Sequence, residues 1–251
     1  MNIILLGHYD IASLYALDRV IRLMPEHRYS VFLSGELKTP AALDDRLVDL
    51  ARVDEHLCER FIAGELVGPI RKELALLPEL PQPNSTQGLR KVQLLQPELV
   101  VSIRYRRILQ PEFIQVAKHG VINLHSGILP DYRGVMATFW AMLAGEPQIG
   151  TTLHRIIDAG IDTGPVIEIN PRQTRPKSSY LTNVIGLYAD GCDAIVRAIR
   201  TFSAKEALPG HRQNAVGQYF RTPDSGALTR YERGGLALFD GSEDLEFGSR
   251  R

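Results

Sequence analysis

The sequence contains little cysteine and no excess of charge of either sign. Only Cys58 and Cys192 occur among 251 residues, too few for a disulfide framework and without the paired spacing of a zinc site. We therefore expect two reduced core cysteines and no metal. The 29 basic residues are matched by 29 acidic ones. Such a chain has no overall positive field to attract nucleic acid, so no nucleic-acid partner is expected.

Long hydrophobic runs are also missing. No stretch of about 18 apolar residues is present, so we expect neither a transmembrane helix nor a membrane partner. The first residues form a short apolar run without a positively charged start, which favours a buried strand over a secretory signal peptide. A cytoplasmic protein is the default expectation. The turn at 7–10 lacks the G-x-G-x-x-G pattern, which argues against a dinucleotide-binding protein.

The sequence does contain an alternation of apolar runs and amphipathic segments. Ile3–Leu6 and Tyr29–Leu33 are typical of buried strands, and between them the apolar residues of Ile11–Leu23 recur at helical spacing. This strand–helix–strand order predicts a parallel sheet with right-handed crossovers. Two further strands are expected at Leu99–Ile103 and Val121–Leu124. The predicted fold class is therefore α/β, with a mostly parallel sheet and helices on both faces.

The composition changes near Pro209, after a long amphipathic helix expected over 180–202. We therefore predict a main domain over residues 1–205 and a short β-rich extension over 206–251. Short strands or extended segments are expected within this extension, at 218–223, 227–231 and 236–239. Its last apolar side chains are Leu236, Leu238 and Phe239. They could cover a partner subunit in a homodimer or fold back onto the chain's own core, and both alternatives stay open.

Three motifs follow one another between residues 120 and 167. Asn123 and His125 stand at the end of a predicted strand, where alternate residues point to the same face. The loop Leu129–Gly134 reads LPDYRG, and the turn Asp162–Gly164 reads DTG. Alone, an Asn-x-His pair carries no signal, and a DTG sequence is commonly a β-turn. Together, in this order and within one short span, they form a specific signal.

The three motifs resemble the signature of the N10-formyltetrahydrofolate-dependent formyltransferases, which act on glycinamide ribonucleotide, methionyl-tRNA or sugar amines. The resemblance implies a Rossmann-like formyltransferase fold, with residues 1–205 as the catalytic domain. It also implies transfer of a formyl group from N10-formyltetrahydrofolate to an amine. Asn123 and His125 would then donate to the oxyanion of a tetrahedral intermediate, while Asp162 would orient the imidazole and receive the amine proton.

The resemblance also indicates the binding residues. Backbone groups of a run matching Arg107, Ile108 and Leu109 line the pterin pocket of the family, and the loop after residue 156 would close its other side. The expected contacts from that loop are Ile157, Asp158 and Ile161. Contacts to the acceptor substrate are expected from His8, Tyr9, Tyr132, Arg133 and Gly134. A solvated loop histidine is an equal alternative for His8, and a solvated or phosphate-facing patch is an alternative for Arg104 and Arg106.

Two departures from the family pattern affect this region. Relatives usually read His-Pro-Ser, whereas this chain has His125, Ser126 and Gly127. Small residues in place of proline are expected to loosen the loop. The spacing from His154 to Asp162 is one residue longer than the family pattern, so a buried structural role is favoured for His154.

Two of the three classes of acceptor substrate used by the family are not expected for this chain. Asp10 stands in the turn where glycinamide ribonucleotide enzymes hold phosphate, and its charge would repel that group. The 49 residues that follow the long helix are too few for the basic C-terminal domain of the methionyl-tRNA enzymes. A small amine remains, either an amino sugar nucleotide or an amino-acid-like amine. Two alternative functions stay open: a hydrolase that releases formate from formyltetrahydrofolate, and a folate-binding protein without turnover.

Overall fold

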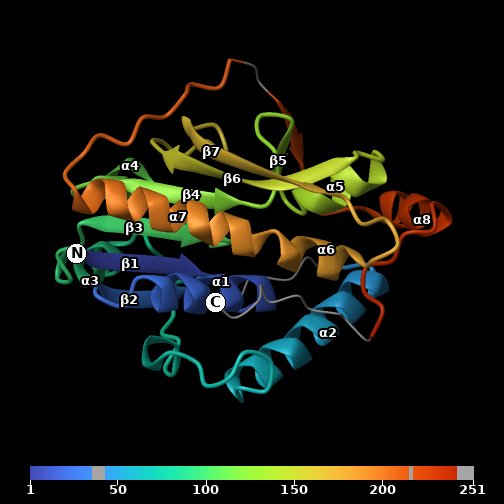
Figure 1. Ribbon diagram of the computed structural model, residues 1–251, viewed down its shortest axis with the longest axis horizontal. Coiled ribbons are helices and arrows are strands. Elements are labelled where there is room, and N and C mark those ends of the chain that lie inside the picture. The colour runs from blue at the N-terminus through green and yellow to red at the C-terminus, as the bar shows by residue number, and fades with distance from the viewer. Residues whose placement is uncertain (36–42, 215–216, 242–251) are drawn as a thin grey trace.

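The computed structural model describes residues 1–35, 43–214 and 217–241. Figure 1 shows a central sheet with helices packed against it. Six strands form this sheet in the order β2-β1-β3-β4-β6-β7. Their bounds are β1 (Asn2–Gly7), β2 (Arg28–Leu33), β3 (Leu99–Ile103), β4 (Val121–His125), β6 (Gln148–Ile156) and β7 (Val166–Gln173).

The first four of these strands pair in parallel. Along β1, Ile3 and Leu5 enter one hydrophobic cluster, whereas Ile4 and Leu6 enter a second cluster on the opposite face. A strand that is buried on both faces needs apolar residues at every position, which explains the continuous apolar runs. The α/β fold class with a mostly parallel sheet is therefore confirmed.

Helices cover both faces of the sheet. The helical segments are α1 (Ile11–Leu23), α2 (Asp45–Ile62), a 3-10 turn (Lys72–Leu74), α3 (Thr86–Gln93), α4 (Pro111–Ile114), α5 (Ala137–Leu143), α6 (Tyr180–Gly186), α7 (Tyr188–Ser203) and α8 (Ser225–Arg233). Helices α1 and α7 contact each other over one face (Figure 1). Val92 of α3 and Phe113 of α4 belong to the hydrophobic cluster on the other face. Within the described residues, no helix is long and apolar enough to cross a lipid bilayer.

The second half of the sheet is antiparallel. Strand β6 pairs with β4 and then with β7, so that Asn123 lies opposite His154. The register between β6 and β7 shifts at Leu153 and His154, and such an irregularity re-aims the side chains beside it. This antiparallel register is what places a β6 residue next to the end of β4.

The long helix expected over 180–202 is two helices, α6 and α7, which meet at Leu187. The guanidinium of Arg172 donates to the carbonyl of Gly186. This contact gives that carbonyl a partner outside the helix ladder at the point where the two helices join.

The β-rich character predicted for the C-terminal extension is wrong. One three-residue strand, β8 (Gln218–Phe220), pairs with β5 (Tyr132–Gly134), and helix α8 replaces the strand expected at 227–231. The carboxylate of Asp224 accepts from the amide of Ala227 and so caps α8. Leu238 is buried in the chain's own core, with Leu236 and Phe239 packed against it. The domain boundary after residue 205 stays a prediction, and residues 242–251 lie outside the described part.

Candidate active site

Four polar side chains meet at the C-terminal end of β4. Asn123 and His125 come from β4, His154 comes from β6, and Asp162 comes from the turn that follows β6. The Nδ2 atom of Asn123 lies 3.0 Å from Nε2 of His154. One carboxylate oxygen of Asp162 lies 3.3 Å from the same Nε2, and the other lies 3.5 Å from Nδ1 of His125. The structure therefore brings together the three residues predicted to be catalytic, and it adds His154.

The local sequence explains how Asp162 reaches this cluster. Asp162 itself adopts the left-handed backbone region, with a φ of 54°, which aspartate tolerates better than most residues. Gly164 is required for a different reason, because a Cβ atom there would lie 1.8 Å from the carbonyl oxygen of Arg155. The tight approach of this turn to β6 holds the carboxylate against the two histidines.

The ring of His154 is oriented by a backbone carbonyl. Its Nδ1 lies 3.0 Å from the carbonyl oxygen of Arg155, and since a carbonyl can only accept, Nδ1 carries a proton. In the neutral ring, Nε2 then accepts from the amide of Asn123, while a second proton on Nε2 would be donated to Asp162. His154 is buried, as expected from the sequence. No pattern in the sequence predicted that the His154 ring would link two catalytic candidates.

His125 is held at both ring nitrogens. Its Nε2 lies 2.7 Å from the carbonyl oxygen of Tyr132, to which it donates, and its Nδ1 faces Asp162. Gly127 makes this packing possible, because a Cβ atom there would lie 2.6 Å from Nε2 of His125. The glycine that departs from the family pattern thus allows the LPDYRG loop to close over the imidazole.

The surroundings of Asp162 keep its carboxylate ionised beside the rings of His125 and His154. Burial alone would raise the pKa of Asp162. The charge of His125, the hydrogen bond and charge of His154 and the amide of Gly134 outweigh burial and hold that pKa well below its usual range. The amide of Gly134 donates to one oxygen of Asp162 at 2.9 Å. Asp162 can therefore stabilise positive charge on either histidine while remaining ionised.

The residues expected to line the folate pocket lie on two loops. Three isoleucines keep large fractions of their surface exposed: 50% for Ile108, 57% for Ile157 and 36% for Ile161. Leu109 is buried in the core, the side chain of Arg107 donates to the carbonyl of Ser34, and Asp158 accepts from the amide of Gly160. Exposed isoleucines on two loops are apolar surfaces that a flat aromatic ring could cover.

Three of the predicted acceptor residues make contacts that build the site. The hydroxyl of Tyr132 donates to Glu146 at 2.8 Å, and its ring stacks on Phe220. The guanidinium of Arg133 donates to the carbonyls of Ile161 and Gly217. Through these contacts, and through the bond from Gly134 to Asp162, the β5 segment ties the LPDYRG loop to the Asp162 turn.

The other two predicted acceptor residues, His8 and Tyr9, follow β1. The Nδ1 atom of His8 lies 2.7 Å from the hydroxyl of Ser34. Burial and the charge of Arg106 lower the pKa of His8 to about 4, so it is neutral at physiological pH. Tyr9 keeps 39% of its surface exposed. The histidine can therefore offer a hydrogen bond at the end of β1, and the tyrosine can offer an apolar ring.

The prediction that Asp10 repels phosphate needs correction. Asp10 is buried at the start of α1, and both of its oxygens accept from Nε of Arg104 at 2.9 Å. Arg106 adds a contact at 3.4 Å. Burial would raise the pKa of Asp10, but the two arginines and His8 lower it overall. Asp10 is therefore an internally neutralised anion that occupies the helix terminus, and Arg104 is neither solvated nor phosphate-facing.

A buried tyrosine connects this ion pair to the cluster around Asp162. The guanidinium of Arg104 lies 3.4 Å from the hydroxyl of Tyr188, and that hydroxyl also bonds the side chain of Ser126, the neighbour of His125. Arg104 adopts a left-handed φ of 58°. The sequence pattern gave Tyr188 only a place in an amphipathic helix and gave no signal for this bridging role.

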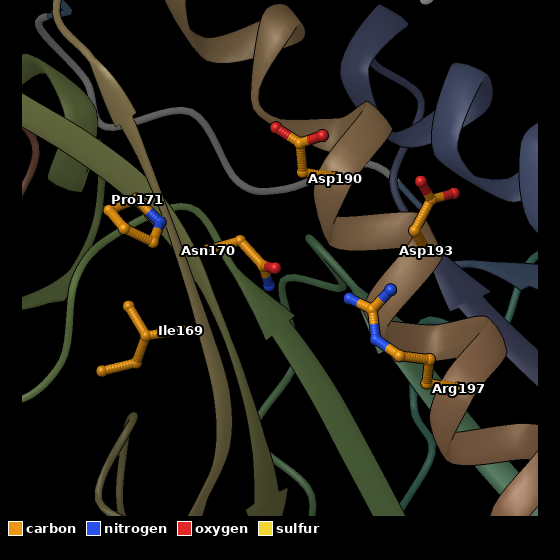
Figure 2. Close-up of a pocket in the computed structure, with 6 residues that line it drawn as sticks. All are labelled: Ile169, Asn170, Pro171, Asp190, Asp193 and Arg197. Atoms are coloured by element: carbon orange, nitrogen blue, oxygen red, sulfur yellow. The ribbon is translucent and has the colours of Figure 1, made fainter.

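A separate hollow of about 210 Å³ lies between β7 and α7. Figure 2 shows its lining, in which Asn170 of β7 faces the charged residues Asp190, Asp193 and Arg197 of α7. Arg197 already pairs with Glu168, and Asp193 pairs with Arg19. None of the residues in the Asn123–Asp162 cluster lines this hollow, so we assign the candidate active site to the cluster.

Sequence comparisons match the part of the chain that contains this cluster. The family model described as formyl transferase matches residues 81–176, a range that contains all four residues of the cluster. The chain is 37% identical over 131 residues to a methionyl-tRNA formyltransferase from Thermodesulfovibrio yellowstonii, an alignment covering 48% of this chain and 42% of that protein. The chain thus spans less than half the length of this curated relative.

Comparisons of structures extend over nearly the whole chain. A likely sugar N-formyltransferase from Mycobacterium tuberculosis superposes with a TM-score of 0.61 and 13% identity, covering 94% of this chain and 88% of that one. The formyltransferase PseJ from Anoxybacillus kamchatkensis gives a TM-score of 0.55 and 17% identity, covering 99% and 100%. At these identities the likeness shows a shared fold. The resemblance to the formyl transferase family is therefore carried by residues 81–176, the segment that holds the whole cluster.

Proposed function

We propose that this protein transfers a formyl group from N10-formyltetrahydrofolate to the primary amine of a small metabolite. The observation that carries the proposal is the cluster in which Asn123 contacts His154 and Asp162 lies against both His154 and His125, within the residues that match the formyl transferase family model. The exposed isoleucines 108, 157 and 161 fit the donor, because they offer apolar surface to a pterin ring.

Each side chain has a role that its contacts allow. The bound formyl-folate supplies the formyl carbon that the amine attacks and the carbon–N10 bond that breaks. One amide hydrogen of Asn123 is directed to His154, and the second can donate to the formyl oxygen as negative charge develops there. Asp162 keeps its charge beside His125 and His154. This charge stabilises the imidazolium that forms when a neutral histidine of the cluster accepts the amine proton, and the imidazolium can then give a proton to N10 as the carbon–N10 bond breaks.

Related proteins support the choice of donor and acceptor. PseJ was solved in complex with a UDP-linked 4-formamido sugar and tetrahydrofolate, and the sugar 3N-formyltransferase WlaRD was solved in the presence of dTDP and 5-N-formyl-THF. The zero net charge of this chain gives no support for a tRNA acceptor. We therefore place amino sugar nucleotides first among the acceptors.

The donor site is tested by thermal unfolding of the wild type with 5-formyltetrahydrofolate. A rise in the unfolding temperature with ligand concentration is the expected result. An acceptor screen with sugar-nucleotide amines then follows, in which transfer to the amine and release of formate are measured separately. Formate release without amine formylation would favour the hydrolase alternative, and no stabilisation at high concentration would remove the folate site.

Asn123 is tested by replacement with alanine. Loss of one oxyanion donor is expected to lower kcat by about 100- to 1,000-fold without loss of the fold. Asn170→Ala is a matched control, because Asn170 lies on β7 in the hollow of Figure 2. Near-full activity of Asn123→Ala would take Asn123 out of the catalytic set.

A further inference from the structure

The C-terminal extension contacts two segments of the candidate active site, the turn that carries Asp162 and strand β5. Its backbone pairs with β7, where the amide of His211 donates to the carbonyl of Val166 at 2.7 Å and the amide of Val166 donates to the carbonyl of His211 at 2.9 Å. This pair of bonds extends the antiparallel edge of the sheet by one residue. It fixes the direction of the extension just beyond the turn that carries Asp162.

Gln213 is the next residue of the extension to touch the site. Its Nε2 donates to the carbonyl of Asp162 at 2.9 Å and to the carbonyl of Gly164 at 2.8 Å. A primary amide has two hydrogens, so both are used on one turn. The two carbonyls flank Thr163, and this bidentate contact therefore fixes the turn on both sides of its centre.

The extension also contacts the site through β5, the last part of the LPDYRG loop. Strand β8 pairs with β5, with Arg133 opposite Tyr219. The amide of Val135 donates to the carbonyl of Phe220 at 2.9 Å. Because Gly134 in turn donates to Asp162, the extension contacts the catalytic aspartate through its backbone on one side and through the LPDYRG loop on the other.

We infer that Gln213 is a positioning residue for Asp162 and that the extension completes the active site. The inference rests on the proposed function for its catalytic consequence. Asp162 is a non-glycine residue in the left-handed region, a conformation that persists only where the surroundings enforce it. Gln213 supplies that enforcement, because its two bonds hold the carbonyls on either side of the turn. Residues 206–221 lie outside the range that matches the family model.

The test uses two substitutions in the full-length protein. Gln213→Glu keeps the size of the side chain but, when ionised, has no donor for the two carbonyls, and Gln213→Met removes the donors without adding charge. Gln218→Glu is the matched control, because Gln218 lies in the same extension with an exposed side chain. Folding of each variant is checked by chemical denaturation before any rate is compared.

Two measurements are made on each variant. Both Gln213 variants are expected to lower kcat by about 10- to 100-fold, since a displacement of about 1 Å at a catalytic group has this effect. The KM for the amine and the affinity for 5-formyltetrahydrofolate should stay within about twofold of wild type. Amide hydrogen exchange of the unliganded protein should become at least about fivefold faster over 158–166 and at Gly134, but not over 99–103.

The exchange measurement separates this inference from the proposed function. If wild type has no formyl-transfer activity, the proposed function fails, and faster exchange over 158–166 still supports the positioning role. Exchange that matches the Gln218→Glu control would overturn the inference even if kcat fell. Retained kcat with a raised KM would also overturn it, because it would assign Gln213 to substrate binding.

Discussion

Two buried carboxylates follow strands of the central sheet, and the partners of the two differ in kind. Asp10, after β1, is neutralised by Arg104 and Arg106, whereas Asp162, after β6, faces two histidines. The surroundings lower the pKa of both carboxyls. Arginine does not release its proton in proteins, but histidine gains and loses one near neutral pH. Asp10 therefore belongs to a permanent ion pair, and Asp162 belongs to the cluster for which we propose proton transfer.

Removing the charge of Asp10 and removing the charge of Asp162 should have different consequences. A buried ion pair with permanent charges fixes the packing of α1 against β3, since removing one partner leaves the other uncompensated. A carboxylate between imidazoles instead sets where a proton resides during a reaction. Replacing each carboxylate by the isosteric amide separates these roles, because shape is kept and charge is removed.

The largest effect is expected from Asp162→Asn. The amide can still accept the bond from Gly134, so the fold should be retained, but it cannot stabilise charge on His125 or His154. We expect kcat to fall by about 1,000-fold or more, as for other aspartates that orient a catalytic histidine. Steady-state formylation is the measurement, and Asp190→Asn, in the hollow of Figure 2, is the control. If Asp162→Asn kept activity within tenfold of wild type, Asp162 would have no catalytic role that distinguishes it from Asp10.

Asp10→Asn should act on stability more than on rate. The amide keeps the cap of α1, whose bond to the amide of Ser13 is 2.9 Å long, while Arg104 loses its counter-charge. We expect the free energy of unfolding to fall by about 3 kcal/mol at pH 7. Urea denaturation measures this change, and kcat per folded molecule should stay within about tenfold of wild type.

The pH dependence of the Asp10 effect follows from the lowered pKa. The stability that ionised Asp10 contributes is fully present above its ordinary value of 3.8 and is lost as the pH falls further toward the folded-state pKa. The difference between wild type and Asp10→Asn should therefore shrink below pH 4. A difference that stayed constant down to pH 2 would show that the charge of Asp10 is not its cause.

The sequence predicted one of these clusters and not the other. Asn123, His125 and Asp162 fall within 40 residues and match a family pattern, so their proximity followed from the motif. Asp10 and Arg104 are 94 positions apart, and their pairing depends on β1 lying beside β3. His154 reached the cluster through the antiparallel register of β4 and β6.

Helices were predicted correctly where the apolar spacing was regular and missed where it was weak. The helix over Ile11–Leu23 was found with the predicted bounds, because its apolar spacing is regular and Asp10 caps it. The helix α8 was missed because its buried residues, Ala227, Leu228 and Tyr231, are few and follow a glycine. Asp224, a residue type that commonly caps helix N-termini, was the signal in the sequence that could have predicted α8.

A third carboxylate, Asp54, lies near Asp10, and its pKa is shifted in the opposite direction. Burial and the charge of Asp10 raise the pKa of Asp54 to about 7, and the side chain accepts from the amide of Ile11. A raised folded-state pKa means that stability is lost as the pH rises through about 7. Asp54→Asn should therefore change the free energy of unfolding little at pH 4 and increase it by about 2 kcal/mol at pH 8. Equal effects at the two pH values would contradict the shift.

The smallest effect is expected at Ile157, an exposed apolar side chain on the loop between β6 and Asp162. Ile157 is 57% exposed, so Ile157→Ala should change the free energy of unfolding by less than about 0.5 kcal/mol. If the ring of a folate covers this side chain, the truncation removes about 1 kcal/mol of apolar contact. The Kd for 5-formyltetrahydrofolate should then rise about fivefold, as measured by calorimetry. Leu94→Ala, at an exposed leucine next to α3, should leave the Kd unchanged. An unchanged Kd for Ile157→Ala would show that the folate ring does not cover this side chain.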